Sequence, residues 1–466
     1  MLFTFHYLRS WDLQTDFLLR SFISYHALGW KVYSHLSSNQ RNLRSLHTTF
    51  GDLGWVHAPL SPLPLAHLRT IDVCFNGTQH LAYFFEALCS RSTGETLERL
   101  ALSIVDNDHQ HETASEVAKT FERRITSFPK LKELSLLNLR RDLGDMFVLL
   151  SRHIRFEHLL RLNVASCDDS FLFFSDMGKY FKVQGSSLQH LWLRGPNDDL
   201  HYLDLLECCD QISSLHINLP EGLFTPILQE SLIRLGPLLD TLALHEQALE
   251  GIDWRREQSL DATKLYQSCR NLRFLGHQLA CSQFEMPRDQ DFVSISKILV
   301  STFILPLLCT PSIQDCINII QENFHYLSNL RVVHFRYMPT RSHREEDPDN
   351  MPDQTQVTAD IQHFVTTVFA YMDRSGICSR LRGIVFGMYW EPESPYGLPI
   401  EWGLEWPYTR HCFVRGYQTD AFNRKATVAL PVPPHKIREL EPDCDLLDFD
   451  PECDWVGGIA GRLRSV

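Results

Sequence analysis

The sequence lacks the motifs that mark the common enzyme classes. It contains no G-x-S-x-G, no H-E-x-x-H, no phosphate-binding glycine loop and no G-x-G-x-x-G after a predicted strand. The S-x-x-K at residues 294–297 has no companion motif. We therefore predict no catalytic residues and no cofactor, and we keep an enzyme only as a distant alternative.

Metal-binding and disulfide patterns are missing as well. The 13 cysteines form no C-x-x-C pair and do not alternate with histidine at zinc spacing. We expect no metal site and reduced thiols, as in cytoplasmic or nuclear proteins. Cys74 and Cys167 lie in or just after predicted strands, where a small apolar side chain packs well.

Long apolar runs and an excess of positive charge are also absent. The longest largely apolar run, residues 298–309, contains Pro306 and is too short to span a bilayer. The first residues do not form a signal peptide pattern. The formal charge of -13 disfavours a phosphate-binding surface as the main activity of the chain, although it permits a local basic patch. We predict neither a nucleic-acid nor a membrane partner.

The feature that dominates the sequence is a repeated leucine pattern. Leu159, Leu162 and Val164, followed by Cys167, match the spacing L-x-x-L-x-L-x-x-C of one leucine-rich repeat. The spacing recurs on both sides of this copy. Further copies begin at Leu43, Leu68, Leu97, Leu131, Leu188, Ile212, Leu239, Leu272, Leu330 and Leu381, with a weaker one at Ile295.

The spacing of the copies predicts the fold class. From Leu43 to Leu272 the step averages about 29 residues, long enough for each repeat to carry a helix. Most segments between copies begin near an N-cap residue and end at Gly or Pro. We predict an α/β leucine-rich-repeat solenoid, a horseshoe with a parallel β-sheet on its concave face and helices on its convex face, followed by a non-repeat C-terminal segment.

Three regions follow from this pattern. Residues 1–42 are predicted to be an N-terminal helical cap or partial repeat, and residues 43–390 the solenoid, with a mobile acidic loop at about 337–360. Residues 391–466 are predicted to hold a β-hairpin, from residues 411–420 and 424–432, and an acidic tail. The tail is interpreted as a solvated or basic-partner-binding strip.

Alternation along the strands predicts a binding surface opposite the leucines. Trp192 is its most informative member, because an aromatic ring on an open sheet is typical of a binding hot spot. Trp192→Ala is expected to reduce partner capture without changing stability. The alternative is a solvated face, or one covered by the 337–360 loop or the C-terminal segment. The candidate residues are Arg161, Asn163, His190, Trp192, Arg194, His216, Asn218 and His245.

The repeats, together with HCFVRGY at residues 411–417 and EPDCD at residues 441–445, resemble the leucine-rich-repeat region of F-box proteins from filamentous fungi. This resemblance implies a substrate receptor of a Skp-Cullin-F-box ubiquitin ligase, with a ligase adaptor and a protein substrate as partners. The first 42 residues contain no Leu-Pro pair and no copy of the F-box. A protein-interaction scaffold unrelated to ubiquitin is the alternative.

Overall fold

Each described copy of the leucine pattern forms one β-strand in the computed structural model. The structure describes residues 10–12, 44–50, 68–75, 94–104, 128–137, 147–194, 202–220, 226–247, 262–277, 321–335, 354–386, 411–419 and 422–446, with single-residue or two-residue gaps at 149, 166, 168–169 and 322. The chain divides into two compact units, residues 1–212 and 213–466. The predicted copy at Ile295 lies outside the described residues.

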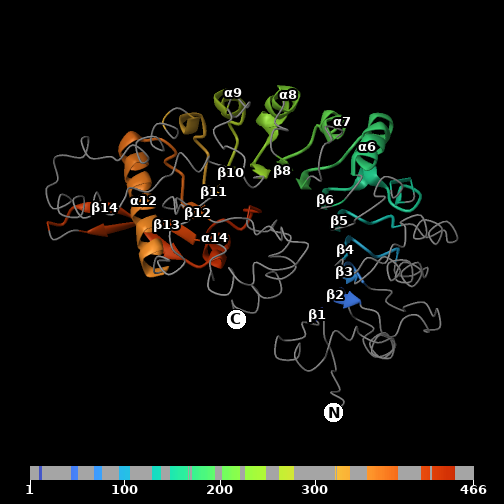
Figure 1. The fold of residues 1–466 in the computed structure, drawn as a ribbon, viewed down its shortest axis with the longest axis horizontal. Coiled ribbons are helices and arrows are strands. Elements are labelled where there is room, and N and C mark those ends of the chain that lie inside the picture. The colour runs from blue at the N-terminus through green and yellow to red at the C-terminus, as the bar shows by residue number, and fades with distance from the viewer. Residues whose placement is uncertain are drawn as a thin grey trace, which may run out of the picture. The chain divides into compact units, whose positions relative to one another are not determined.

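The first unit is a parallel sheet whose strands follow one another in chain order (Figure 1). Every neighbouring pair is parallel. The chain therefore returns from the C-terminal end of each strand to the N-terminal end of the next. The strands are β1 Ser10–Asp12, β2 Ser45–Phe50, β3 Thr70–Phe75, β4 Arg99–Ile104, β5 Glu133–Leu137, β6 Arg161–Ala165 and β7 His190–Arg194.

The leucines of the pattern form the core of the first unit. Leu134, Leu136, Leu162 and Leu191 are at most 2 % exposed. The helices α6 Ser170–Gln184 and α7 Tyr202–Glu207 and the 3-10 turn η1 Phe156–His158 connect the strands. Helix α6 ends at Gly185, whose φ of +80° suits a helix C-terminus. Both helices were predicted, and both are confirmed.

Aromatic side chains fill the space between these elements. The rings of Phe147, Phe156 and Phe173 contact one another, and Tyr180 joins them from α6. The Tyr180 hydroxyl donates a hydrogen bond to Glu157, which gives the polar end of the cluster a partner.

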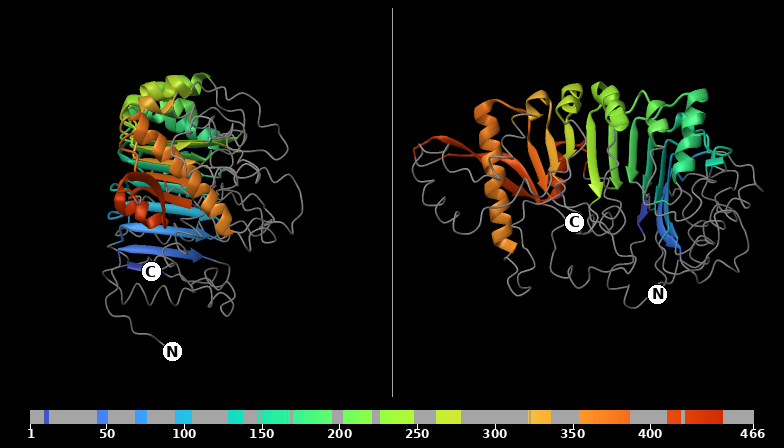
Figure 2. Two further views of the ribbon diagram at one scale, coloured as in Figure 1. Left: turned by 90° about the vertical axis from the view of Figure 1, so that its left-hand side faces the viewer. Right: turned by 45° about the horizontal axis from the view of Figure 1, so that its top comes forward.

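The second unit begins with five parallel strands and ends with a hairpin, which can be followed in Figure 2. The parallel strands are β8 Ser214–Pro220, β9 Thr241–Gln247, β10 Phe274–His277, β11 Val332–Phe335 and β12 Gly383–Phe386. The helices between them are α8 Pro226–Leu235, α9 Ala262–Ser268 and α12 Gln354–Ser375, with 3-10 turns η2 Gly236–Leu238 and η5 Phe324–Tyr326. The coarse prediction of an α/β fold with parallel strands is confirmed.

The predicted hairpin is confirmed, and it extends the sheet of the second unit. Strand β13 His411–Thr419 pairs antiparallel with both β12 and β14 Lys425–Val432. Asn423 in the turn has a φ of +62°, a conformation that asparagine tolerates. Helix α12 packs against β14, where Gln362 donates to the Ala429 carbonyl and the Thr366 hydroxyl accepts from the Ala429 amide.

The expectation of a mobile loop at 337–360 needs correction. Helix α12 begins at Gln354, so the last part of the predicted mobile loop at 337–360 is helical, and the earlier part lies outside the described residues. The amphipathic spacing of Ile361, Phe364, Val365 and Val368, all buried, explains why the helix forms.

No helix within the described residues has the length and apolarity to cross a bilayer.

Candidate functional site

Four of the predicted binding residues lie on two neighbouring strands of the first unit. Arg161 pairs in register with His190, and Asn163 pairs with Trp192. Arg161 is half exposed, whereas Asn163 and His190 are half-buried. The structure therefore brings these four residues together on β6 and β7, as the alternation predicted.

Trp192 differs from the expectation in one respect. Its side chain is only 5 % exposed, so the prediction of an open aromatic ring is wrong. An exposed indole would leave a large apolar area in water, and burial removes that cost. The Oδ1 atom of Asn163, its register neighbour, is also buried and has no hydrogen-bond partner among the described residues.

The exposed part of this surface is a row of charged side chains. Glu133 on β5 lies between Arg99 on β4 and Arg161 on β6, and 3.8 Å separates its carboxylate oxygens from the Nε atom of each arginine. These side chains are 44 %, 33 % and 50 % exposed in strand order. Exposed pairs of this kind contribute little to stability, about 0–1 kcal/mol each, so the row is available for contacts with a partner.

Of the other four candidates, only the His216 side chain is described. His216 on β8 belongs to the second unit and is 3 % exposed. Its position on an accessible surface was therefore predicted wrongly. The backbones of the remaining three lie in described strands, but their side chains lie outside the described residues: Arg194, Asn218 and His245.

Residues 434–446, which we call the C-terminal strap, lie against His216. The strap consists of α14 Pro434–Leu440 and the turn that follows it. Asp445 accepts a hydrogen bond of 2.5 Å from the Ser214 hydroxyl, and its other oxygen lies 3.5 Å from Nε2 of His216. The predicted solvated acidic strip is therefore wrong for this part of the tail.

Apolar contacts hold the strap against the sheet of the second unit. Ile437, Cys444 and Leu446 pack in one buried cluster with residues of five successive strands. Gly383 allows a close approach at this contact, because a Cβ there would lie 3.1 Å from the Ile437 side chain. The sheet residues of the cluster are Ala243, Phe274, Val332, Val385 and Cys412.

A column of arginines binds the carboxylate of Glu441 in the strap. Arg331 donates to its Oε2 atom at 2.9 Å, Arg382 lies 3.1 Å from Oε1, and Arg273 lies 3.8 Å from Oε2. Glu441 is 2 % exposed. Three guanidinium groups thus surround one buried carboxylate, which compensates the cost of removing it from water.

The electrostatics around this column combine burial with charge pairing. Arg273 also contacts Asp443 at 3.0 Å and Asp240 at 3.3 Å. Burial raises the pKa of the Asp240 carboxyl, and the nearby Arg273 opposes that rise. Burial also lowers the pKa of His411 at the start of β13, which favours its neutral form.

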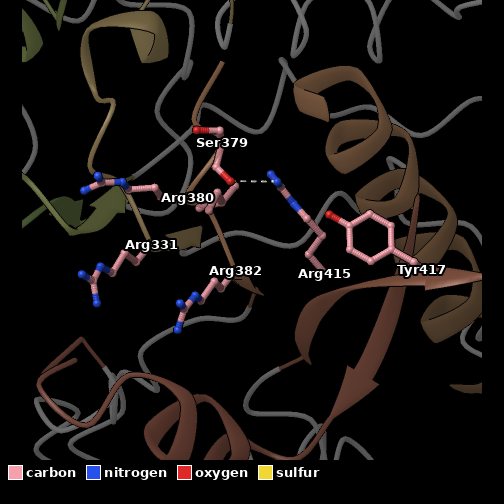
Figure 3. Close-up of a pocket in the computed structure, with 7 residues that line it drawn as sticks. Arg331, Ser379, Arg380, Arg382, Arg415 and Tyr417 are labelled. Atoms are coloured by element: carbon pink, nitrogen blue, oxygen red, sulfur yellow. Dashed lines mark hydrogen bonds between the residues drawn. The ribbon is translucent and has the colours of Figure 1, made fainter. Parts of the chain in front are cut away.

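The arginine column continues into an open cavity of about 440 Å³. Arg331 and Arg382 line it together with Arg380, Arg415 and Tyr417. In Figure 3 the head groups of Arg331 and Arg382 point the same way, whereas Arg415 turns toward the Ser379 carbonyl, 3.2 Å from its Nη1 atom. Four arginines therefore line one recess of the second unit.

The sequence contains a signal for this column that the leucine pattern alone does not reveal. Arg273, Arg331 and Arg382 each follow the first leucine of a copy, at Leu272, Leu330 and Leu381. Their backbones form a chain of hydrogen bonds, so the same repeat position stacks on neighbouring strands. A comparison of the residues at the second position of successive copies would have revealed the column. Glu441, which binds these arginines, lies outside the repeats and has no comparable pattern.

Cysteines occupy another recurring position in the described chain. Cys209, Cys269 and Cys378 each lie three residues before the first apolar residue of a copy, and all three are buried. Burial raises the pKa of Cys269 to about 11 and that of Cys378 to about 12. Cys167 is also buried and donates to the Leu136 carbonyl, which agrees with its predicted packing role.

We expect these thiols to resist alkylation while the chain is folded. At pH 8, iodoacetamide should modify Cys269 and Cys378 at least about 100-fold more slowly than in urea, because burial suppresses both the thiolate and reagent access. Mass spectrometry of the alkylated peptides gives both rates, and the unfolded chain is the control. Equal rates in the two states would contradict the burial of these side chains.

No protein-family model matches the chain, and no curated protein matches it significantly. Among the described residues, no group of three or more His, Cys, Asp or Glu side chains is placed to hold a metal ion.

Proposed function

We propose that this chain is a non-enzymatic protein-recognition module, a leucine-rich-repeat solenoid with the horseshoe form predicted from its sequence. One strand per repeat, buried pattern leucines and connecting helices support the repeat class. Such repeats expose one sheet face whose residues can vary without disturbing the core. That separation between core and surface is what a recognition module requires.

The observation that carries the proposal is the charged row on the sheet of the first unit. Arg99, Glu133 and Arg161 stand on three successive strands and are between one third and one half exposed. In the second unit, the strap already covers residues on the corresponding sheet positions. We therefore assign partner binding to the first unit, with Arg161, Asn163 and His190 as its central residues.

Reversal of one charge in the row tests this assignment. Arg161→Glu is expected to reduce the capture of specific partners from a lysate by at least about tenfold, because buried interface arginines often contribute more than 1.4 kcal/mol. Thermal unfolding should change little, since the Arg161 pair is exposed. Quantitative mass spectrometry of the captured proteins gives the ratio.

The matched control is Lys182→Glu, the same charge reversal on an exposed residue of α6 in the same unit. This variant should capture the same proteins as the unchanged chain. Equal loss in both variants would assign the effect to net charge. Undiminished capture by Arg161→Glu would remove the charged row as the binding surface.

A narrower form of the proposal follows from the family resemblance. The two segments that carry it, residues 411–417 and 441–445, are parts of β13 and of the strap, the elements that complete the second unit. In this form the module is a substrate receptor of a Skp-Cullin-F-box ubiquitin ligase in the cytoplasm or nucleus. Recovery of ligase subunits among the captured proteins supports it, and their absence leaves a scaffold unrelated to ubiquitin.

A further inference from the structure

The arginine-lined cavity of the second unit is chemically distinct from the charged row of the first. Among the described residues, its lining contains four arginines and no carboxylate. Around it, Glu441 and Asp373 each accept contacts from the lining arginines. The four guanidinium groups therefore face two carboxylates, and the recess keeps two positive charges in excess within a chain whose formal charge is -13.

Several donors of this lining are available to a ligand. Arg382 is 59 % exposed and uses one terminal nitrogen for Glu441. Arg380 is exposed and donates from one nitrogen to Asn329 at 2.8 Å. A guanidinium group has five N–H donors in a planar fork, so both keep several of them for an anion.

Arg415 forms a fixed part of the cavity wall. Its side chain is only 8 % exposed and is fixed by Asp373 at 2.9 Å and by two backbone carbonyls. Its Nε atom is nevertheless buried without a hydrogen-bond partner among the described residues. Because this Nε atom has almost no accessible surface, a ligand in the cavity cannot reach it, and Arg415 contributes its positive charge to the recess instead of a hydrogen bond from Nε.

The size of the cavity restricts the ligand further. About 440 Å³ lies within the range of about 300–1,000 Å³ typical of sites for small organic molecules, so an inorganic anion alone would leave most of it empty. Tyr417, which is 52 % exposed, supplies an aromatic ring in the lining. An oxyanion attached to an organic group therefore fits both the charge and the volume.

We propose that this cavity binds a phosphate monoester dianion through Arg380 and Arg382, with the positive charge of Arg415 in the wall and the organic group against Tyr417. Guanidinium groups pair with phosphate oxygens through two parallel hydrogen bonds, and two excess positive charges match a dianion. The site does not depend on the proposed protein-recognition function. The phosphate can belong to a small metabolite or to a phosphorylated side chain of a protein segment, which share this chemistry.

Calorimetric titration of the full chain with phenyl phosphate tests the proposal. We expect saturable binding with a Kd on the order of 100 µM at low ionic strength, which weakens as salt is added. Phenyl sulfate has the same ring and shape but one negative charge, and should bind at least about fivefold more weakly. A phosphotyrosine peptide that binds at least about tenfold more tightly than phenyl phosphate identifies a protein segment as the source, and equal binding identifies a small phosphate.

Two variants separate the site from general effects of charge. Arg380→Gln should weaken phenyl phosphate binding at least about tenfold, because it removes a charge-assisted contact. This variant leaves the contacts of Glu441 in place, so the strap stays closed. Arg382→Gln should have a similar effect, and Arg234→Gln on α8 is the matched control that should bind like the unchanged chain.

Any of three results overturns the proposal. The first is the absence of saturable binding of phenyl phosphate up to about 10 mM at low ionic strength, with folding verified by circular dichroism. The second is equal binding by the unchanged chain and Arg380→Gln, which would place the anion elsewhere. The third is a loss of binding in Arg234→Gln as large as in Arg380→Gln, which would show that net charge and not the cavity determines binding.

Discussion

Replacement of Trp192 by Ala is expected to lower the free energy of unfolding by about 3–5 kcal/mol, the usual cost of truncating a large buried aromatic residue. Trp192 is 5 % exposed, so the deletion removes buried apolar area and leaves a cavity that the strand backbones restrict from collapsing. Urea denaturation followed by circular dichroism measures the change. The indole therefore contributes first to folding, and its loss would impair partner capture only indirectly.

Leu172→Ala in the same unit provides the control for this prediction. Leu172 lies on α6 and is 45 % exposed, so its truncation should cost less than about 1 kcal/mol. Trp192→Phe should lie between the two variants, because it keeps an aromatic ring. If Trp192→Ala unfolded at the same urea concentration as Leu172→Ala, the indole would not be part of the core.

Replacement of Glu441 by Ala is expected to release the C-terminal strap. Removal of one partner from a fully buried ion pair costs about 3–5 kcal/mol. Here Arg331 and Arg382 are 34 % and 59 % exposed, so water can solvate them after the change, and we expect about 2–3 kcal/mol. The strap should therefore open roughly 30- to 150-fold more often.

Trypsin reports this opening directly, because Lys436 and Arg438 are cleavage sites within the strap. Where opening is fast relative to cleavage, the cleavage rate follows the population of the open form. Asp443→Ala is the matched control. Its carboxylate is 71 % exposed, so cleavage should rise by no more than about fivefold. Cleavage of Glu441→Ala at the rate of the unchanged chain would mean that the arginine column does not hold the strap.

The strands were predictable because a single physical signal specifies them. In each copy, side chains that alternate along a strand must place the pattern leucines in the core, and parallel strands repeat the same register. Leu134 and Leu162 illustrate this, since they pair in register and are 1 % and 2 % exposed. The hairpin was predictable from its two strand-like segments and short turn.

The sequence allowed for a C-terminal segment that covers the sheet, but the contacts of the strap were not predictable, because they connect distant parts of the chain. Ser214 and Asp445 are 231 residues apart, and no local pattern in either segment indicates the other. The acidic composition of the tail suggested exposure, since isolated carboxylates rarely become buried. The arginines that compensate Glu441 lie on three separate repeats, so the favourable environment exists only after the repeats have stacked.

The binding surface was predictable in direction but not in accessibility. Alternation correctly placed Arg161, Asn163, His190 and Trp192 together on neighbouring strands. It could not distinguish a side chain that faces solvent from one that another segment covers, which is the difference between Arg161 and His216. Periodicity describes one strand and its neighbours, whereas accessibility depends on the whole fold.

The contacts of α12 with β14 bear on the association between copies of this chain. Among the described strands, β14 has one neighbour, and such an edge can pair with a strand of another molecule and begin aggregation. The side chains of Gln362 and Thr366 occupy the outward-facing carbonyl and amide of Ala429, so an incoming strand would have to displace the helix to pair there. Helix α12 thus blocks edge-to-edge strand pairing at Ala429.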